Sequence, residues 1–277
     1  MNVNLTFKKY FVGELSIKRF VISLVLIPVF VYLGLSVLVY FYAERLIFQP
    51  QTPLYRDSSE IIKLTTSDNE KISAKFYENP NARYVILFSH GNAEDIGGLD
   101  SILKDFQKSD FAVFSFDYRG YGTSEGAPTE EKAYRDIEAA YAYLINELKF
   151  PPEKIIAHGR SLGGAVAINL ASRKKSGGLI VESSFVSAYR VLTKIQIFPF
   201  DQFQSIKRIR DVNCPVLIIH GRKDDIVPFW HGEKLYAAAK DPKFSFWIDT
   251  AGHNNVYSTS KTAYLQAIRD FADNLPK

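Results

Sequence analysis

The hydrophobic pattern separates an apolar N-terminal stretch from a longer region of alternating strands and helices. Phe20 to Tyr42 runs for 23 residues without a charge. As a helix it is about 34 Å long, enough to cross a hydrocarbon core of ~30 Å. The run is longer than a signal-peptide core, and no small-residue cleavage site follows it. We therefore expect an uncleaved transmembrane anchor over residues 20–43.

Beyond this stretch, short apolar runs predict a series of strands. The first two are interrupted by polar residues and indicate an antiparallel pair, whereas the later, nearly continuous runs are typical of parallel strands covered on both faces. The predicted strands are 61–64, 72–77, 84–89, 111–116, 155–157, 179–181, 216–219 and 244–248. Between them, Thr129 to Leu148 has an apolar stripe at helical spacing, with Thr129 as N-cap. Repeated β-α units predict an α/β fold with a mostly parallel sheet and helices on both faces.

The segment 185–211 interrupts this alternation. Its length is unusual for a plain connection, and it combines Phe198, Phe200 and Phe203 with several basic residues. Two interpretations are open. The segment is a small lid over a site, or it is a helical insert whose aromatic side chains seal the edge of the core.

Composition and charge limit the classes of function. Hydrophobic residues make up 47% of the chain and aromatic residues 14%, which supports a large core and excludes disorder. Most of the net charge of +4 lies in residues 1–19, which carry Lys8, Lys9, Lys18 and Arg19 against a single acid. The remainder offers no basic face for nucleic acid. A single cysteine, Cys214, excludes an intramolecular disulfide and is expected to be a buried, structural thiol.

The position of the basic residues also predicts an orientation in the membrane. They precede the apolar run, so the positive-inside rule places the N-terminal segment in the cytoplasm. The region 44–277 is then expected outside the cytoplasm, which means the periplasm if the source is bacterial.

A serine between two glycines marks the candidate nucleophile. Gly159-Arg160-Ser161-Leu162-Gly163 follows a short apolar strand and precedes an apolar helical stretch. Strand, sharp turn and helix are the context in which this motif projects a serine hydroxyl toward a substrate. Ser161 is therefore the expected nucleophile of a serine hydrolase.

A serine nucleophile needs a base to take its proton and a carboxylate to orient that base. In this fold class the order is serine, acid, histidine. His253 lies in a small-residue loop after the last strand and is the expected base, whereas His231 begins a surface helix and is expected to be solvated. Asp224 and Asp225 both follow a buried strand, and Glu182 is a distant third candidate. Asp224 is the stronger choice, although side-chain alternation cannot separate the adjacent pair.

The developing oxyanion needs backbone N–H donors, each worth about 3 kcal/mol. The expected donors are the amides of Leu162, at the start of the helix, and Asn92, in the loop 89–93 after the first parallel strand. His90 is expected to support that loop, and His158 to be buried beneath the site. We expect no cofactor and no metal, because no cluster of His, Asp and Glu has ligand spacing on a shared element.

Five ordered motifs in this chain resemble those of α/β-hydrolase-domain proteins. The resemblance covers roughly residues 40–277 and is closest to the group with single-pass membrane hydrolases and animal protein depalmitoylases, which are serine hydrolases. It implies that Ser161, Asp224 and His253 are the triad, that Asn92 and Leu162 supply the oxyanion hole, and that the turn 117–122 is structural. The motifs are 87–93, 116–122, 159–163, 220–228 and 251–254.

The resemblance implies an anchored hydrolase that cleaves an acyl ester or thioester through an acyl-serine intermediate. Its partners are then the lipid bilayer, through residues 20–43, and the acyl substrate, with no nucleic acid. Depalmitoylases of this group attach through an acylated N-terminal cysteine cluster, which this chain lacks. An extracytoplasmic domain also meets no cytosolic acyl-proteins.

Two other functions remain as alternatives. Peptidases of the same superfamily keep the triad, so amide cleavage is compatible with these residues. A non-enzymatic membrane scaffold with this fold is the other alternative. A decayed site is expected to have lost a triad member, and none is missing here.

Overall fold

The computed structural model describes residues 17–276, and the chain divides into two compact units, Met1–Leu46 and Ile47–Lys277. Helix α2, Ile17–Ile47, has Pro28 inside it. The most apolar 18 residues within Phe20–Ile47 have a mean hydropathy of 2.6 and are only 6% buried. Within the described part of the chain it is the one helix long and apolar enough to cross a membrane. The first residues of the basic segment 1–19, including Lys8 and Lys9, lie outside the described residues.

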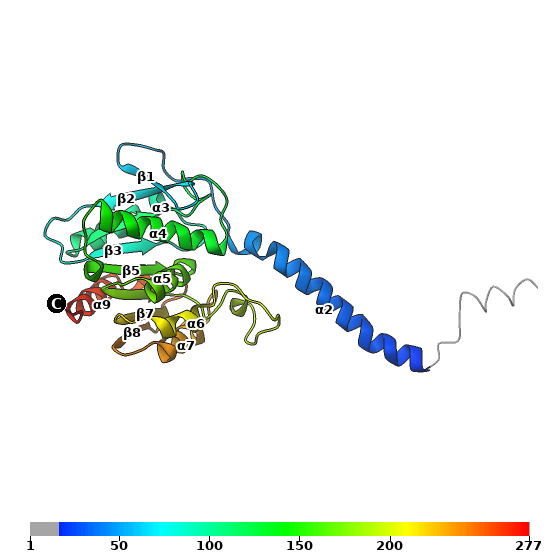
Figure 1. Ribbon diagram of the computed structural model, residues 1–277. Coiled ribbons are helices and arrows are strands. Elements are labelled where there is room, and N and C mark those ends of the chain that lie inside the picture. Colours follow the sequence, from blue (N-terminus) through cyan, green and yellow to red (C-terminus); the bar gives the residue numbers. More distant parts are fainter. Residues whose placement is uncertain (1–16, 277) are drawn as a thin grey trace, which may run out of the picture. The chain divides into compact units, whose positions relative to one another are not determined.

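An eight-stranded sheet forms the centre of the second unit (Figure 1), in the order β1-β2-β4-β3-β5-β6-β7-β8. Strand β2 pairs antiparallel with β1 and β4, and every pairing from β4 to β8 is parallel. The strands are β1 Ile61–Thr65, β2 Lys71–Tyr77, β3 Val85–Ser89, β4 Ala112–Phe116, β5 Ile155–Arg160, β6 Gly178–Glu182, β7 Val216–Gly221 and β8 Lys243–Ile248. All eight predicted strands are present, and the predicted α/β fold is confirmed.

Helices cover both faces because alternate strand side chains point to opposite sides. In β3, Val85 and Leu87 join the core beneath α4, α5 and α7, whereas Ile86 and Phe88 join the core beneath α3, α8 and α9. The helices are α3 Ile96–Lys108, α4 Glu130–Asn146, α5 Leu162–Arg173, α6 Ser205–Arg208, α7 Trp230–Ala238, α8 Val256–Thr259 and α9 Lys261–Asp273. Short 3₁₀ turns occupy Pro152–Lys154, Tyr189–Val191 and Ile209–Asp211.

Helix α4 shows how local sequence sets an element's limits. The Thr129 side chain accepts a hydrogen bond from the amide of Lys132, as expected of an N-cap. The helix ends at Asn146, two residues before the predicted end. Lys149 adopts a φ of 60°, and the Phe150 amide bonds back to the Leu144 carbonyl. A left-handed residue of this kind closes a helix C-terminus.

The segment 185–211 has a buried base and an exposed outer part. Phe203 is fully buried, and its ring lies 5.8 Å from Phe48 and 5.7 Å from Tyr134. Leu192 is 91% exposed and Ile195 is 71% exposed. One of the three aromatic side chains therefore seals the core, while apolar residues of the outer part remain accessible.

Candidate active site

The turn that carries Ser161 is built from contacts that only glycine allows. Strand β5 ends at Arg160 and helix α5 begins at Leu162, and Ser161 between them has a φ of 52°. A Cβ atom on Gly159 would lie 2.0 Å from the carbonyl oxygen of Gly163. A Cβ on Gly163 would lie 2.0 Å from the Ser89 carbonyl oxygen of β3. The turn is therefore locked against the sheet with its serine in a strained conformation.

Three side chains from separate connections form one hydrogen-bonded chain. Nε2 of His253 lies 3.0 Å from the Ser161 hydroxyl oxygen, and Nδ1 of His253 lies 2.8 Å from Oδ2 of Asp224. These residues follow β5, β7 and β8, whose carboxyl ends meet at one edge of the sheet. Open α/β sheets collect ligand and catalytic groups at this edge. The structure thus brings the predicted nucleophile, base and acid together.

The Asp224 carboxylate is surrounded by donors. Its Oδ1 accepts hydrogen bonds from the amides of Ile226 and Val227, at 3.1 and 2.7 Å. Burial alone would raise its pKa, but His220, His253 and the Val227 amide together lower the pKa to about 2. Asp224 is thus ionised at neutral pH and accepts from Nδ1–H of His253. Nε2 of His253 then faces the Ser161 hydroxyl as a hydrogen-bond acceptor.

The structure distinguishes the two adjacent aspartates that side-chain alternation could not separate. Asp225 is exposed, whereas Asp224 is buried and faces His253. The sequence did not predict a contact between His220 and the acid. The buried Nε2 of His220 donates to the Val227 carbonyl and lies 3.3 Å from Oδ2 of Asp224. Its position four residues before Asp224 was visible in the sequence, but the loop conformation that turns both side chains together was not.

The loop after β3 lies against the serine turn. Among the residues the structure describes, neither the Asn92 amide nor the Leu162 amide has a hydrogen-bond acceptor. Glu94 accepts from the Gly91 amide and forms an ion pair with Arg160, which ties the loop to the turn. His90 is fully buried and its Nδ1 bonds the Gly91 carbonyl, consistent with a supporting role.

The remaining candidates lie outside the hydrogen-bonded chain. The buried Glu182 carboxylate accepts a hydrogen bond from the Tyr264 hydroxyl and lies 3.2 Å from Nε2 of His158. Its partners are therefore Tyr264 and His158, and not His253. The expectation of a solvated His231 is wrong. His231 is fully buried, and its Nδ1 accepts from the Val186 amide at 3.2 Å. It is buried because helix α7 turns this side chain, with Leu235, toward the core.

The turn 117–122 is held by an internal ion network. Arg119 is fully buried and donates to both Asp136 of α4 and Asp68 of the β1–β2 turn. Asp117 accepts from the amide of Ile96 at the start of α3. Through these contacts the turn 117–122 links α3, α4 and the β1–β2 turn to one another.

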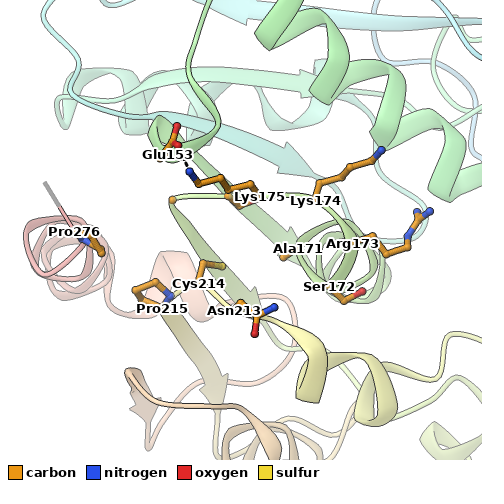
Figure 2. Close-up of a pocket in the computed structure, with 12 residues that line it drawn as sticks. Glu153, Ala171, Ser172, Arg173, Lys174, Lys175, Asn213, Cys214, Pro215 and Pro276 are labelled. Atoms are coloured by element: carbon orange, nitrogen blue, oxygen red, sulfur yellow. Dashed lines mark hydrogen bonds and ion pairs between the residues drawn. The ribbon is translucent and has the colours of Figure 1, made fainter.

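A separate pocket of about 470 Å³ lies at the opposite edge of the sheet (Figure 2). It is lined by residues that precede β5, β6 and β7, so it adjoins the amino ends of those strands. Lys175 pairs with Glu153 across it, and Arg173 stands in the last turn of α5, where a cation complements the helix dipole. Cys214 also lines it, and burial raises the pKa of this thiol to about 12, so it is unreactive as a thiolate.

Metal ligation has no candidate in the described structure. Across residues 17–276, no group of three or more His, Cys, Asp or Glu side chains is placed to hold a metal ion. The acidic and imidazole groups around Ser161 are instead engaged with one another and with backbone amides.

Comparison with known proteins places the chain in a family. Alpha/beta hydrolase domain-containing protein 17B of Homo sapiens is 38% identical over 221 residues, which cover 78% of this chain and 76% of the relative. The chain belongs to the α/β-hydrolase family. A family model described as serine aminopeptidase, S33, matches residues 80–205. As a member of this family, the protein is a serine hydrolase.

Solved structures agree with this family's fold. An esterase of Pyrococcus furiosus superposes on the hydrolase with a TM-score of 0.70 at 19% identity, covering 82% of this chain and 99% of the esterase. Alpha/beta hydrolase domain-containing protein 10 from mouse gives a TM-score of 0.61 at 20% identity, and the match covers 78% of this chain and 99% of the mouse chain. At this level of identity, the likeness shows the fold alone.

Proposed function

We propose that Ser161, His253 and Asp224 are the catalytic triad of a hydrolase that cleaves an acyl ester or thioester. The observation that carries the proposal is the continuous hydrogen-bonded chain from the Ser161 hydroxyl through His253 to Asp224, at 3.0 and 2.8 Å. These distances lie within the range in which a base takes a proton directly from a nucleophile.

The protonation states follow from the contacts. Because Asp224 is ionised and only accepts, it fixes the proton of His253 on Nδ1 and leaves Nε2 as the base. Ser161 Oγ attacks the acyl carbon while its proton passes to Nε2. The tetrahedral intermediate then collapses, and the proton on Nε2 leaves with the alcohol or thiol. Water repeats the sequence on the acyl-serine, which releases the acid and restores the hydroxyl.

The negative oxygen of each tetrahedral intermediate needs donors that are already in place. The amide of Leu162 begins helix α5, so it has no intrahelical acceptor. We assign it and the amide of Asn92 as the oxyanion hole. Loss of one such donor typically slows turnover by about 10² to 10³-fold.

The substrate class and the anchor belong to the same proposal. Residues 20–43 anchor the chain in the bilayer, residues 44–277 form the catalytic domain, and the segment 185–211 acts as a small lid. Support comes from the length and hydropathy of α2 and from exposed apolar residues of the lid, Leu192 and Ile195. An apolar lid on a membrane-tethered enzyme fits a substrate with an acyl chain.

The proposal is tested with a fluorophosphonate probe and a chain-length series of p-nitrophenyl esters and acyl thioesters. We expect the full-length protein to be labelled and to turn over esters, and Ser161→Ala to lose both. Ser172→Ala is the matched control, since this serine lies on the same helix and bonds only its own backbone turn. Equal labelling of Ser161→Ala and wild type would overturn the assignment of the nucleophile.

A peptidase is the second candidate, because the matching family model is described as a serine aminopeptidase. The same triad and oxyanion donors serve amide hydrolysis, with an amine as the leaving group. Aminoacyl p-nitroanilides assayed beside the esters discriminate the two: a higher kcat/KM on the anilides assigns the enzyme to peptides.

A further inference from the structure

The last residue of α2 and the chain just after it bond directly to the side chain of Asn92. Asn92 Nδ2 donates to the carbonyl of Ile47 at 2.6 Å, and its Oδ1 accepts from the amide of Gln49 at 2.9 Å. The Tyr121 hydroxyl donates to the same Oδ1 at 2.6 Å and accepts from the Gln49 amide at 3.0 Å. All four residues lie within the unit Ile47–Lys277. We call Ile47, Phe48 and Gln49 the connector.

Buried rings hold the connector and Tyr121 in place. Phe48, between the two hydrogen-bonding residues, is 5% exposed and packs against Phe203. Tyr121 is 1% exposed, and its ring lies 5.4 Å from that of His90. Burial holds the pKa of the Tyr121 hydroxyl well above its usual range, so this group remains a hydrogen-bond donor at neutral pH.

The loop that these contacts hold is conformationally demanding. Ala93, next to Asn92, has a φ of 59°, which is unfavourable for a residue with a Cβ atom. Glu94 still ties the loop to the serine turn through Gly91 and Arg160, but loss of the bonds to the Asn92 side chain loosens the segment around Asn92 and lets its amide shift. A shift of ~1 Å in a catalytic donor costs up to about 10²-fold in rate.

We propose that the connector and Tyr121 are positioning residues of the oxyanion hole, because they fix the Asn92 side chain and thereby aim the Asn92 amide. This inference rests on the proposed function. Its consequence is that the chain leaving the apolar helix is part of the catalytic apparatus. The connector then does more than join an anchor to an independent enzyme.

The first test removes one hydroxyl. Tyr121→Phe deletes the donor to Asn92 and the acceptor for Gln49 while keeping the buried ring. The matched control is Tyr141→Phe, which deletes a hydroxyl that donates to the Lys175 carbonyl at the opposite edge of the sheet. In full-length protein in detergent, we expect Tyr121→Phe to lower kcat on a p-nitrophenyl ester about 10-fold with KM changed less than about twofold. Tyr141→Phe should keep kcat within about twofold.

The second test asks whether Tyr121 acts through Asn92. If it does, the double variant Tyr121→Phe/Asn92→Ala is no slower than Asn92→Ala alone, because the contact is already absent. The inference is overturned if the rate loss of the double variant equals the product of the losses of the two single variants. It is also overturned if Tyr121→Phe has the same kcat as Tyr141→Phe. Thermal midpoints of all variants identify a loss of rate that is due to unfolding.

The same assays separate this inference from the proposed function. Absence of ester turnover and of fluorophosphonate labelling in the wild type overturns both. Normal wild-type activity, abolished in Ser161→Ala but unchanged in Tyr121→Phe, overturns the positioning inference alone.

Discussion

The buried imidazoles of this domain differ in the atoms that face their ring nitrogens. His253 lies between a carboxylate and a hydroxyl, so both of its ring nitrogens have a side-chain hydrogen-bond partner. His231 instead accepts a backbone N–H on Nδ1 and is otherwise packed in the core. Protonation of Nδ1 would break that bond. Burial, together with the positive charge of Arg190 and the proximity of His220, lowers the pKa of His231 to about 4.

This low pKa predicts a specific pH dependence of stability. In the unfolded chain a histidine takes up its proton near pH 6.5, whereas His231 in the folded state does so only near pH 4. Between these values the unfolded state binds more protons, so stability falls as the pH decreases from about 6.5 to about 4. His231→Asn keeps an acceptor for the Val186 amide without this titration. Urea unfolding at a series of pH values should show a shallower loss in the variant, and parallel profiles would contradict the prediction.

Individual residues also show which choices the sequence supports and which it does not. Chain order and loop position selected His253, because only a histidine after the acid fits the order of this fold. Periodicity could not choose between Asp224 and Asp225, because the choice depends on which side chain the loop turns inward; only the family resemblance implied Asp224. His231 was misassigned because its helix is short, and a short helix gives too little pattern to show which face is buried.

At the scale of elements, the unit formed by β5, the serine turn and α5 depends on close backbone contact with β3. The space at Gly163 is filled by the Ser89 carbonyl, a main-chain atom that cannot rotate away. The serine is therefore presented by packing of one element on another as much as by its own turn.

Gly163→Ala should therefore destabilise the domain by about 2 kcal/mol or more, the range typical of overpacking, and lower ester turnover with it. The matched control is Gly98→Ala in α3, where the added methyl meets the flexible end of Leu54 at 3.0 Å. Thermal unfolding of both variants measures the difference. Equal midpoints would show that β3 moves to accommodate the methyl group.

The strands themselves were predictable because both faces of the parallel sheet are buried, which makes them nearly continuous apolar runs. The carboxyl ends of the strands were less predictable. Strand β5 continues to Arg160 and β7 to Gly221, past the last apolar residue of each run. These polar extensions adjoin the candidate site, where the residues do not follow the apolar pattern of a buried strand. The spatial order of the strands, with β4 and β5 on either side of β3, requires tertiary contacts that no local pattern contains.

At the scale of the whole molecule, the charge of the N-terminal segment predicts how the protein lies in a membrane. Four basic residues precede the apolar run: Lys8, Lys9, Lys18 and Arg19. Glu44 and Arg45 follow it, and their opposite charges cancel. Basic residues are retained on the cytoplasmic side. The domain after α2 should then be outside.

A reporter that is active only in the cytoplasm, fused after Lys277 and expressed in a bacterial host, should therefore be inactive. Replacing the four basic residues by Gln removes the bias and should yield a fraction of inverted, active molecules. Full reporter activity in the unmodified sequence would place the domain in the cytoplasm and reverse the orientation.

If Ser161 and His253 act as proposed, their positions along the chain also determine when hydrolysis becomes available during synthesis. They are 92 positions apart, and His253 follows the last strand. A ribosome therefore completes the serine turn well before it makes the proposed base. Before His253 is made, the Ser161 hydroxyl lacks the proposed partner for its proton. A chain that ends before His253 should therefore have no hydrolase activity.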